Sequence, residues 1–348
     1  MKKNLNRDLF VIEFVRFVSS PQTHAKRVRK IKKTLQICPD NLNKIQWLKL
    51  WRGFYYSIWY TEMRKGGEEL IEVIGSFQNG SFLLSGFKSL MESWSGIDSF
   101  RIDKYMFLIR IMLRNVLKQQ ITSLIKKEVL FENNNIFKEY KKNQKLKIQD
   151  SLKLIKNEKD DSIKNIPCFM FHVSVVDYIV SITSYSVGLF LHVCDIYLEE
   201  LQKCVSELAV EDSSKALIYY EMVIPFAKQL SFTNDDRIRT SIRENIFDKL
   251  IDDLIINEAV SIRIDILNKF LTPLIEIACR TESGKNRICL YRILKKFRSK
   301  FSSLNSGPDN IFNIKRKIVG IDHKTKKIKF ETVTTTPFVR SIVPLPLI

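Results

Sequence analysis

The sequence predicts an all-α protein in which antiparallel helices stack in series, and three observations support that fold class. Glycine is scarce, at 11 of 348 residues. Apolar residues recur at intervals of three and four, the spacing of one helix face, instead of alternating as they do in strands. Short turns separate the helices, as in HEAT or armadillo-like solenoids, although no clean internal repeat is visible.

Six helices are expected in the N-terminal part of the chain. They span residues 5–18, 21–38, 42–63, 68–77, 82–94 and 99–127. The second begins at a Ser–Pro pair, because Ser favours the cap of a helix and Pro its first positions. The third carries Trp47, Trp51 and Trp59 among aromatic residues three and four apart, so we expect this helix to be deeply packed.

The stretch from Trp94 to Arg110 is expected to begin with a turn and to continue as a core helix. Gly96 permits a tight turn, and Asp98 is placed to cap the following helix, whose free amides attract a carboxylate. From residue 102 onward, apolar side chains step by four and three along one face. With Asp103, the cations of this helix are expected to form exposed ion pairs of little energy; they are Arg110, Arg114 and Lys118.

Six further helices are expected after a change of composition. Residues 131–166 are rich in Lys and Asn, so we interpret them as an insertion or linker within a helical-repeat domain of residues 1–304. The later helices span residues 169–181, 187–208, 214–230, 237–256, 261–279 and 286–301. Residues 305–348 form a basic tail, either a hairpin that turns near residues 323–326, an extended segment that orders on a partner, or a disordered one.

The chain is strongly basic, with 57 Lys and Arg against 38 Asp and Glu and a formal net charge of +19. Such an excess favours polyanionic partners, nucleic acid first, and compositional bias toward Lys is the simpler alternative. Six cysteines without C-x-x-C spacing predict neither a zinc site nor a disulfide framework, which fits a reducing compartment. Charges interrupt the N-terminal apolar run, and the charge-free run at residues 178–194 is short, so we expect neither a secretion signal nor a membrane span.

The sequence offers no catalytic constellation. Its paired aspartates, at 160–161, 235–236 and 252–253, are adjacent residues whose side chains diverge, unlike the clustered carboxylates of a metal-dependent nuclease. His172 and His192 lie in apolar runs without a metal-ligating partner, so we interpret them as core histidines. Neither a phosphate-binding loop nor a nucleophile elbow is present. We therefore expect no enzyme, cofactor, metal site or small-molecule substrate.

Basic residues gather on two helices that a nucleic-acid backbone could follow. On the second helix, Val28, Ile31 and Leu35 share one face, and the cations share the opposite one. RNA would gain there by counterion release, and a solvated helix face is the equal alternative. The candidate RNA contacts are Lys26, Arg27, Arg29, Lys30 and Lys33 on this helix and Arg292, Lys295, Lys296 and Arg298 on the last one. An acidic region elsewhere would repel RNA and is expected to bind a basic protein. Its members are Asp195, Glu199, Glu200, Glu207, Glu211 and Asp212, of which the first three are the candidate partner contacts.

Five segments resemble a known family in their order and nearly in their spacing. They are SSPQTHAKRVRKIKK from Ser19, WLKLWRGFYYSIW from Trp47, WSGIDSFRIDKYMFLIRIMLR from Trp94, LFLHVCDIYLEEL from Leu189 and IPFAKQLSFTNDDRIRTSIRENIFDKLI from Ile224. Together they are similar to the ribosomal RNA processing protein 1 family of nucleolar large-subunit assembly factors, and ILKKFRSKF from Ile293 resembles the basic helix that closes the family domain. The positions assigned to the structural core or to the family motifs are Trp47, Trp51, Gly53, Trp59, Trp94, Gly96, Asp98, Asp103, Lys104 and Arg110.

The resemblance implies a helical-repeat protein of the nucleus and nucleolus, without catalysis of its own, that joins pre-60S particles and is needed to mature the precursor of 25S/28S and 5.8S rRNA. Its implied partners are pre-rRNA and other large-subunit assembly factors. Two features depart from the family: a longer segment after Phe131, and a short basic tail in place of a long charged extension. Lys315 to Lys317 and Lys324 to Lys327 are candidates for nuclear import or for RNA contact. A helical-repeat adaptor for protein binding or transport, without an RNA role, is the alternative function.

Overall fold

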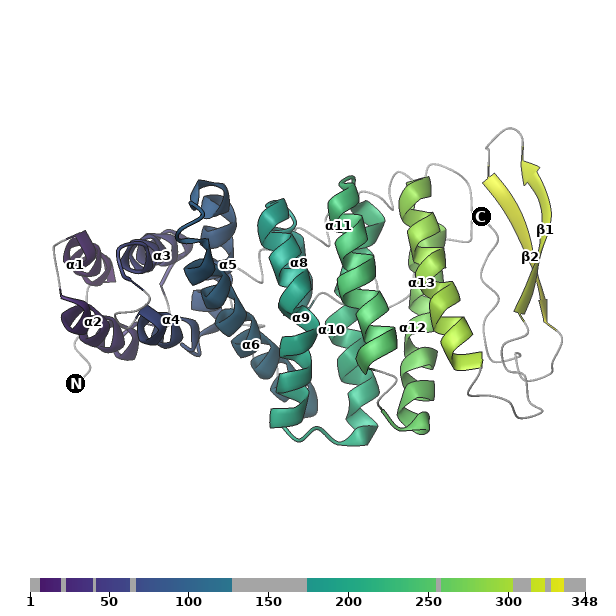
Figure 1. Cartoon of the computed structure of the whole chain (residues 1–348), viewed down its shortest axis with the longest axis horizontal. Helices are drawn as coiled ribbons and strands as arrows, with labels where there is room; N and C mark the ends of the chain where they lie inside the picture. Colours follow the sequence, from purple (N-terminus) through teal and green to yellow (C-terminus); the bar gives the residue numbers. More distant parts are fainter. Residues whose placement is uncertain are drawn as a thin grey trace.

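The structure is a computed structural model that describes residues 7–19, 23–39, 42–62, 67–126, 174–254, 258–302, 314–322 and 327–334. Its helices form an elongated stack (Figure 1). They are α1 (Arg7–Ser19), α2 (His24–Gln36), α3 (Lys44–Trp59), α4 (Gly67–Gly75), α5 (Gly80–Ser93), η2 (Trp94–Gly96), α6 (Ile102–Lys126), α8 (Val175–Thr183), α9 (Val187–Glu207), α10 (Asp212–Phe232), α11 (Asp236–Ser241), η5 (Ile242–Asp248), η6 (Leu250–Leu254), α12 (Val260–Arg280) and α13 (Gly284–Ser302). The all-α solenoid predicted from the sequence is confirmed over this part of the chain.

The helices alternate between two layers. In the first layer α1, α3, α5, α8, α10 and α12 pack in series, and in the second α2, α4, α6, α9, α11 with η5 and η6, and α13 do the same. Two ion pairs show the relative direction of α6 and α9 in the second layer. Arg110 contacts Glu199, and eight residues later on both helices Lys118 contacts Glu207. α6 and α9 therefore run parallel, as equivalent helices of stacked pairs do. Figure 1 shows α1 to α4 nearly end-on and α8 to α13 side-on, so the helix direction rotates along the stack.

The turns inside the helix pairs lie along one edge of the stack, which we call the hairpin edge. It comprises residues 60–62, 94–101, 184–186, 233–235 and 281–283. Neighbouring turns are joined by hydrogen bonds. Lys104 at the start of α6 donates to the carbonyl of Thr61 after α3, and Asn286 at the start of α13 donates to the carbonyl of Thr233 after α10.

The N-terminal half of the core is built around the aromatic face of α3. Trp47 and Trp51 are at most 1% exposed. Trp51 Nε1 donates to the Phe82 carbonyl of α5 over 2.7 Å, and the two rings are 4.5 Å apart. Gly53 lets α1 approach α3, because a Cβ atom at that residue would lie 2.7 Å from the Phe14 ring. The deep packing predicted for this helix is confirmed.

Polar side chains begin several helices. Asn43 precedes α3 and forms a capping box with Gln46, in which each side chain accepts from the backbone amide of the other residue. Ser174 and Asp177 form the same arrangement at the start of α8. These caps supply acceptors for amides that the first turn of a helix leaves without an intrahelical partner.

The turn before α6 differs from the expectation at two residues. Asp98 does not cap α6, because the helix begins at Ile102 and the Asp98 carboxylate pairs with Arg101. It is the Asp98 carbonyl that accepts from the amides of Arg101 and Ile102. Gly96 ends the short 3-10 helix Trp94–Gly96, and a Cβ atom there would meet nothing within 4 Å, so the turn does not require glycine.

The segment predicted as one α-helix over residues 237–256 is α-helical only in α11 and continues as the π-helices η5 and η6. Ile242, Ile246 and Phe247 of η5 still face the core. A π-helix makes i→i+5 hydrogen bonds, yet over one or two turns it presents an apolar face much as an α-helix does. Hydrophobic spacing alone therefore did not reveal the difference.

After the helices the chain forms a two-stranded antiparallel hairpin. β1 (Ile314–Asp322) pairs with β2 (Lys327–Thr334), with an irregularity between Ile318 and Gly320. Of the three forms considered for the tail, the structure has the hairpin at these residues. The predicted insertion, residues 131–166, lies outside the described residues. None of the described helices is both long and apolar enough to cross a membrane.

Candidate RNA and protein-binding surfaces

The basic face of α2 is exposed, as its helical spacing predicts. The face toward the core consists of Val28, Ile31 and Leu35, each of which is at most 6% exposed. Lys26, Arg29 and Lys33 are exposed on the opposite side, and no carboxylate of the described residues pairs with them. Lys30 is half-buried, with its Nζ 5.8 Å from the centre of the Phe17 ring. We call Lys26, Arg29, Lys30 and Lys33 the basic stripe. Its charge is not neutralised within the described fold.

Arg27 is a correction to the predicted RNA contacts. It is 8% exposed, and its Nη1 donates to Thr61 Oγ1, 2.9 Å away in the segment after α3. Burial lowers the pKa of its guanidinium group. The helical position of Arg27 lies between the two faces of α2, so its neighbours decide its direction. The hydroxyl of Thr61 draws it inward, and Arg27 holds α2 against the end of α3.

The last helix, α13, keeps only part of its predicted RNA-binding set. Its exposed cations include Arg292, Lys295 and Arg298. Lys296 instead contacts Asp248 at 2.8 Å and Asp252 at 2.5 Å, on η5 and η6. Burial alone would lower the pKa of Lys296, but hydrogen bonds with Asp248 and Asp252 outweigh it and raise the pKa. Lys296 therefore fastens α13 to the π-helical segment, and we remove it from the candidate RNA contacts.

Glu199 and Glu200 of α9, predicted as part of a partner-binding surface, are bound by cations of α6. Glu200 is 0% exposed and accepts from Arg110 Nη1 at 2.8 Å and from Arg114 Nε at 2.5 Å. Glu199 accepts from Arg110 at 2.8 Å and from Lys203 at 2.5 Å. Hydrogen bonds from Lys203 and Arg110 lower the pKa of Glu199 to about 2. Glu199 and Glu200 thus join two helices of the second layer.

The same kind of contact continues on both sides of α9. Lys118 of α6 pairs with Glu207 at the end of α9. Asp195, the remaining candidate partner contact, is exposed and accepts from Asn245 Nδ2 of η5 at 2.6 Å. We call the pairing of Arg110, Arg114 and Lys118 with Glu199, Glu200 and Glu207 the ion-pair ladder. Arg110 therefore faces α9 and does not form the expected pair with Asp103, which is exposed.

Lys104 ties the start of α6 to the end of α3. Its side chain is 7% exposed, and Nζ donates to the carbonyls of Ile58 at 2.9 Å, Trp59 at 3.1 Å and Thr61 at 2.8 Å. The end of a helix leaves such carbonyls without an intrahelical donor, and a cation there also suits the helix dipole. Arg101 lies over the Trp59 ring, 4.4 Å from its centre. Burial lowers the pKa of Lys104. The sequence named Lys104 only as a motif position; its role depends on the fold.

Trp94 and His192 connect the turn before α6 with α9. Their rings stack with centres 6.4 Å apart and planes 16° apart. His192 is 8% exposed, and its Nε2 lies 3.1 Å from the Met106 carbonyl. Burial lowers the pKa of His192, so a neutral imidazole donates from Nε2 to that carbonyl. The interpretation of His192 as a core histidine is confirmed.

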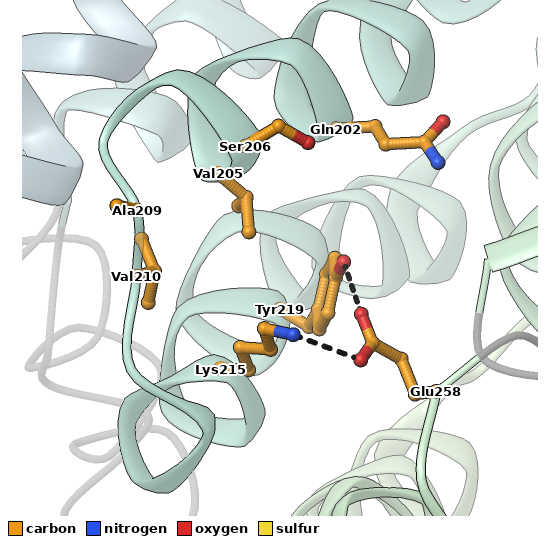
Figure 2. Close-up of a pocket in the computed structure, with 8 residues that line it drawn as sticks. All are labelled: Gln202, Val205, Ser206, Ala209, Val210, Lys215, Tyr219 and Glu258. Atoms are coloured by element: carbon orange, nitrogen blue, oxygen red, sulfur yellow. Dashed lines mark hydrogen bonds and ion pairs between the residues drawn. The ribbon is translucent and has the colours of Figure 1, made fainter.

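A pocket of about 260 Å³ lies beside the end of α9 and the start of α10 (Figure 2). Figure 2 shows Lys215 and Tyr219 converging on Glu258, whose carboxylate oxygens lie 3.0 Å from Lys215 Nζ and 3.3 Å from Tyr219 Oη. Hydrogen bonds with Asp212 and Glu258 raise the pKa of Lys215, and burial raises the pKa of Tyr219. Neither group is poised as a base near neutral pH. The polar groups of this pocket satisfy one another and connect α10 to the segment before α12.

The described residues contain no cluster of three or more His, Cys, Asp or Glu side chains that could hold a metal ion. The adjacent aspartates considered for catalysis are held by cations. Asp235 is bound by Arg237, whose hydrogen bonds lower the pKa of Asp235 to about 2. Asp252 is bound by Lys296, which lowers its pKa as well. Outside the described residues lie His172 and residues 160–161.

Similarity to known proteins extends over most of the helical stack. The chain matches the family Nop52, described as "Nucleolar protein, Nop52", over residues 12–156 and 148–265. It is 25% identical over 240 residues to the "Ribosomal RNA processing protein 1 homolog" of Dictyostelium discoideum, a match that covers 67% of this chain and 43% of that protein. It is 23% identical over 242 residues to the "Ribosomal RNA processing protein 1 homolog A" of Homo sapiens, covering 66% of this chain and 43% of that protein. The chain thus spans less than half the length of these relatives.

Proposed function

This chain belongs to the Nop52 family of nucleolar proteins, and we propose that it is a non-catalytic scaffold of ribosome biogenesis that acts in the nucleolus. Its proposed setting is the pre-60S particle, where it supports processing of large-subunit pre-rRNA. The names of the curated relatives, which refer to ribosomal RNA processing, support this role. Its proposed partners are the pre-rRNA itself and neighbouring assembly factors.

The basic stripe is the observation that carries the RNA-binding part of this proposal. Lys26, Arg29 and Lys33 are exposed without a carboxylate partner among the described residues. Cations of this kind bind phosphate groups favourably, because each contact releases counterions from the nucleic acid. The ion-pair ladder in the middle of the same layer is neutralised. The stripe on α2 and the exposed cations of α13 therefore give the layer positive ends and a balanced centre.

The pairing of two carboxylates that join helices, Glu200 and Glu258, supports the non-catalytic part of the proposal. Glu200 accepts from two arginines, and Glu258 accepts from Lys215 and Tyr219. A carboxylate bound in this way is neither available as a metal ligand nor free to take a proton from a substrate. These groups join helices to one another, which is the work of a scaffold.

Replacement of all four basic-stripe residues by Gln in the full chain tests the RNA-binding step. Binding of large-subunit pre-rRNA fragments is followed by fluorescence anisotropy over a salt series. We expect weaker binding and a salt slope reduced by about 3 to 4, because each of the four phosphate contacts contributes roughly 0.7 to 0.9. The double variant K249Q/K269Q serves as the control, since it removes exposed lysines of other elements. Its slope is expected to stay close to that of the unmodified chain.

Three outcomes would contradict parts of the proposal. An unchanged affinity and slope in the stripe variant would remove α2 as an RNA contact. Protein partners that remain bound after nuclease and high salt, with no RNA affinity of the chain, would favour the adaptor for protein binding or transport. RNA cleavage by the purified chain with added metal would contradict the non-catalytic assignment.

A further inference from the structure

Every exposed aromatic side chain of the described residues lies at or next to the hairpin edge. The exposed fractions are 42%, 65%, 92%, 75% and 76% for Tyr56, Tyr60, Phe100, Tyr185 and Phe232. Tyr56 precedes Tyr60 by one helical turn, and their rings stack with centres 6.3 Å apart. The turns described at the other edge, residues 76–79 and 208–211, carry no exposed aromatic residue. Among the described residues, the exposed aromatic side chains therefore lie on one side of the stack.

Each of four successive helix pairs contributes one of these side chains. Tyr60 follows α3, Phe100 precedes α6, Tyr185 lies between α8 and α9, and Phe232 ends α10. Successive pairs pack against one another, and packed helices lie about 8–10 Å apart. The side chains therefore repeat along the edge at roughly the helix spacing. Figure 1 shows this edge at the top of the stack where α10 turns into α11 and α12 turns into α13.

The fold does not account for this row of aromatic residues. Side chains that are about two-thirds or more exposed bury little apolar surface, and single cases are ordinary, but a row along one edge is typical of a binding surface. The backbone beneath the row is fixed. Thr61, next to Tyr60, is bound by Lys104 and Arg27, and Thr233, next to Phe232, is bound by Asn286. The rings of Tyr60 and Phe232 are therefore presented from turns that side chains hold in place, which lowers the entropy lost on binding.

The hairpin edge is positive at both ends. The contact between Arg27 and Thr61 sets the first turn of α2, and with it Lys26, beside the end of α3. At the other end Arg280 and Arg287 are exposed next to the turn between α12 and α13, where they outnumber Glu282, which is exposed in that turn.

Between these ends the charges of the edge are close to balanced. Asp98 pairs with Arg101, and Asp235 pairs with Arg237. Asp103 remains exposed. Attraction for a phosphate backbone is therefore modest along the middle of the edge. A polyanion bound there must gain most of its affinity from the aromatic rings.

We propose that the hairpin edge binds single-stranded RNA, with unpaired bases stacked on Tyr60, Phe100, Tyr185 and Phe232. Stacking on aromatic side chains tolerates any sequence, because every base has an aromatic face. A duplex keeps these faces covered by its own stacking, so it cannot use the row. The positive ends favour RNA over an extended peptide, which has no regular negative charge. This inference rests on the proposed role in rRNA processing and specifies the class of RNA that this surface binds.

The test replaces these four residues by Leu in the full chain, Y60L/F100L/Y185L/F232L. Leu keeps an apolar side chain but removes the flat ring, and the high exposure of these positions predicts unchanged thermal unfolding. The probes are an oligouridylate of about 15 nucleotides, within the site sizes of single-strand binders, and an RNA duplex of equal length. We expect at least about tenfold weaker oligouridylate binding, because several stacks are lost together. Duplex affinity and both salt slopes are expected to stay unchanged. The control I45A/I125A removes exposed apolar side chains at the opposite edge of the stack and is expected to change neither affinity.

The outcomes separate this inference from the proposed function. If the unmodified chain binds oligouridylate and the leucine variant binds it equally well, the edge is not the single-strand site, and the basic stripe still supports the proposed function. An equal loss for duplex and single strand would also overturn stacking. If the unmodified chain binds neither probe nor pre-rRNA, both proposals fail. A leucine variant that keeps its RNA affinity but loses a protein partner in cells would identify the edge as a protein-binding surface and overturn the inference.

Discussion

Replacement of Lys104 by Met removes the polar link between α3 and α6 while it keeps most of the side-chain volume. In the native structure Nζ donates to three carbonyls, those of Ile58, Trp59 and Thr61, over 2.8–3.1 Å. The contacts with Ile58 and Thr61 are buried, and the contact with Trp59 is partly accessible. Met fills the path of the lysine stem but offers no donor. The substitution therefore isolates the hydrogen bonds from the packing.

The expected cost follows from the carbonyls left without a donor. A buried polar group without its partner costs about 1–3 kcal/mol, so the two buried carbonyls together cost about 2–6 kcal/mol. The lost cation at the end of α3 adds roughly 0.3–1 kcal/mol. The substitution also has a favourable effect. Burying the lysine ammonium group costs several kcal/mol of hydration, and Met does not incur this cost, so part of the loss is offset. We expect a net destabilisation of about 3 kcal/mol.

Urea unfolding followed by circular dichroism measures this loss, and hydrogen exchange localises it. Amides at the end of α3 and the start of α6 are expected to exchange faster, while those of α12 and α13 stay protected. Lys104→Arg is the companion variant: it keeps the charge, but a planar guanidinium cannot direct three donors around one point as an ammonium does, so an intermediate loss is expected. A loss below about 1 kcal/mol for Lys104→Met would show that water replaces the ammonium group, and it would refute the reasoning.

Three further predictions concern the packing and the charges of the stack. Glu200→Gln weakens the ion-pair ladder and is expected to cost about 2 kcal/mol in urea unfolding; a loss under about 0.5 kcal/mol would mean that the ladder does not hold α6 to α9. Gly86→Ala is expected to cost about 2 kcal/mol or more despite its better helix propensity, because the added Cβ overlaps the Trp51 ring. Gly96→Ala, which meets nothing within 4 Å, is its control and is expected to change stability by less than about 0.5 kcal/mol; equal effects of the two substitutions would contradict the packing argument. The folded pKa of Glu199, about 2, lies below its ordinary value of 4.5. Its contribution is therefore complete above about pH 4.5 and is lost as the pH falls toward 2. Glu199→Gln should flatten the dependence of the urea midpoint on pH in that window, and an unchanged slope would exclude this carboxylate as its source.

Helix spacing predicted which side chains of α2 face the core, and the reason is geometric. The sequence fixes the angle of each residue around the helix axis, and a surface helix has one apolar side, so Ile31 is buried and Lys33 is exposed. Arg27 was misassigned because its angle falls at the boundary between the two faces. There the direction of a long side chain depends on a neighbour, in this case Thr61. That neighbour is 34 residues away in the sequence and is known only from the fold.

Contacts between helices of one layer could not be predicted from the residue pattern of each helix alone. Arg110 and Glu200 are 90 residues apart, and each looked like an exposed charge on its own helix. The angular position of a residue around its helix axis indicates whether its side chain points toward or away from the core. It does not indicate which helix lies beside that side chain. One signal was present: the cations of α6 repeat every four residues, and acids of α9 recur over the same number of turns. Matching charge spacing on two helices of a predicted solenoid favours an inter-helix ladder over two independent binding surfaces.

The uneven distribution of exposed cations follows from position in the stack. A helix in the middle of the second layer has neighbours on both flanks, so the cations of α6 meet carboxylates of α9. α2 and α13 stand at the two ends of the described stack, where one flank has no neighbouring helix to supply carboxylates. Counterion release by RNA is therefore concentrated at the ends, and stacking is confined to the edge between them. The two variants replace different residues, so their losses should add for a single strand, while duplex affinity responds to the stripe alone. Single-strand losses that fail to add would mean that both substitutions disturb one shared site.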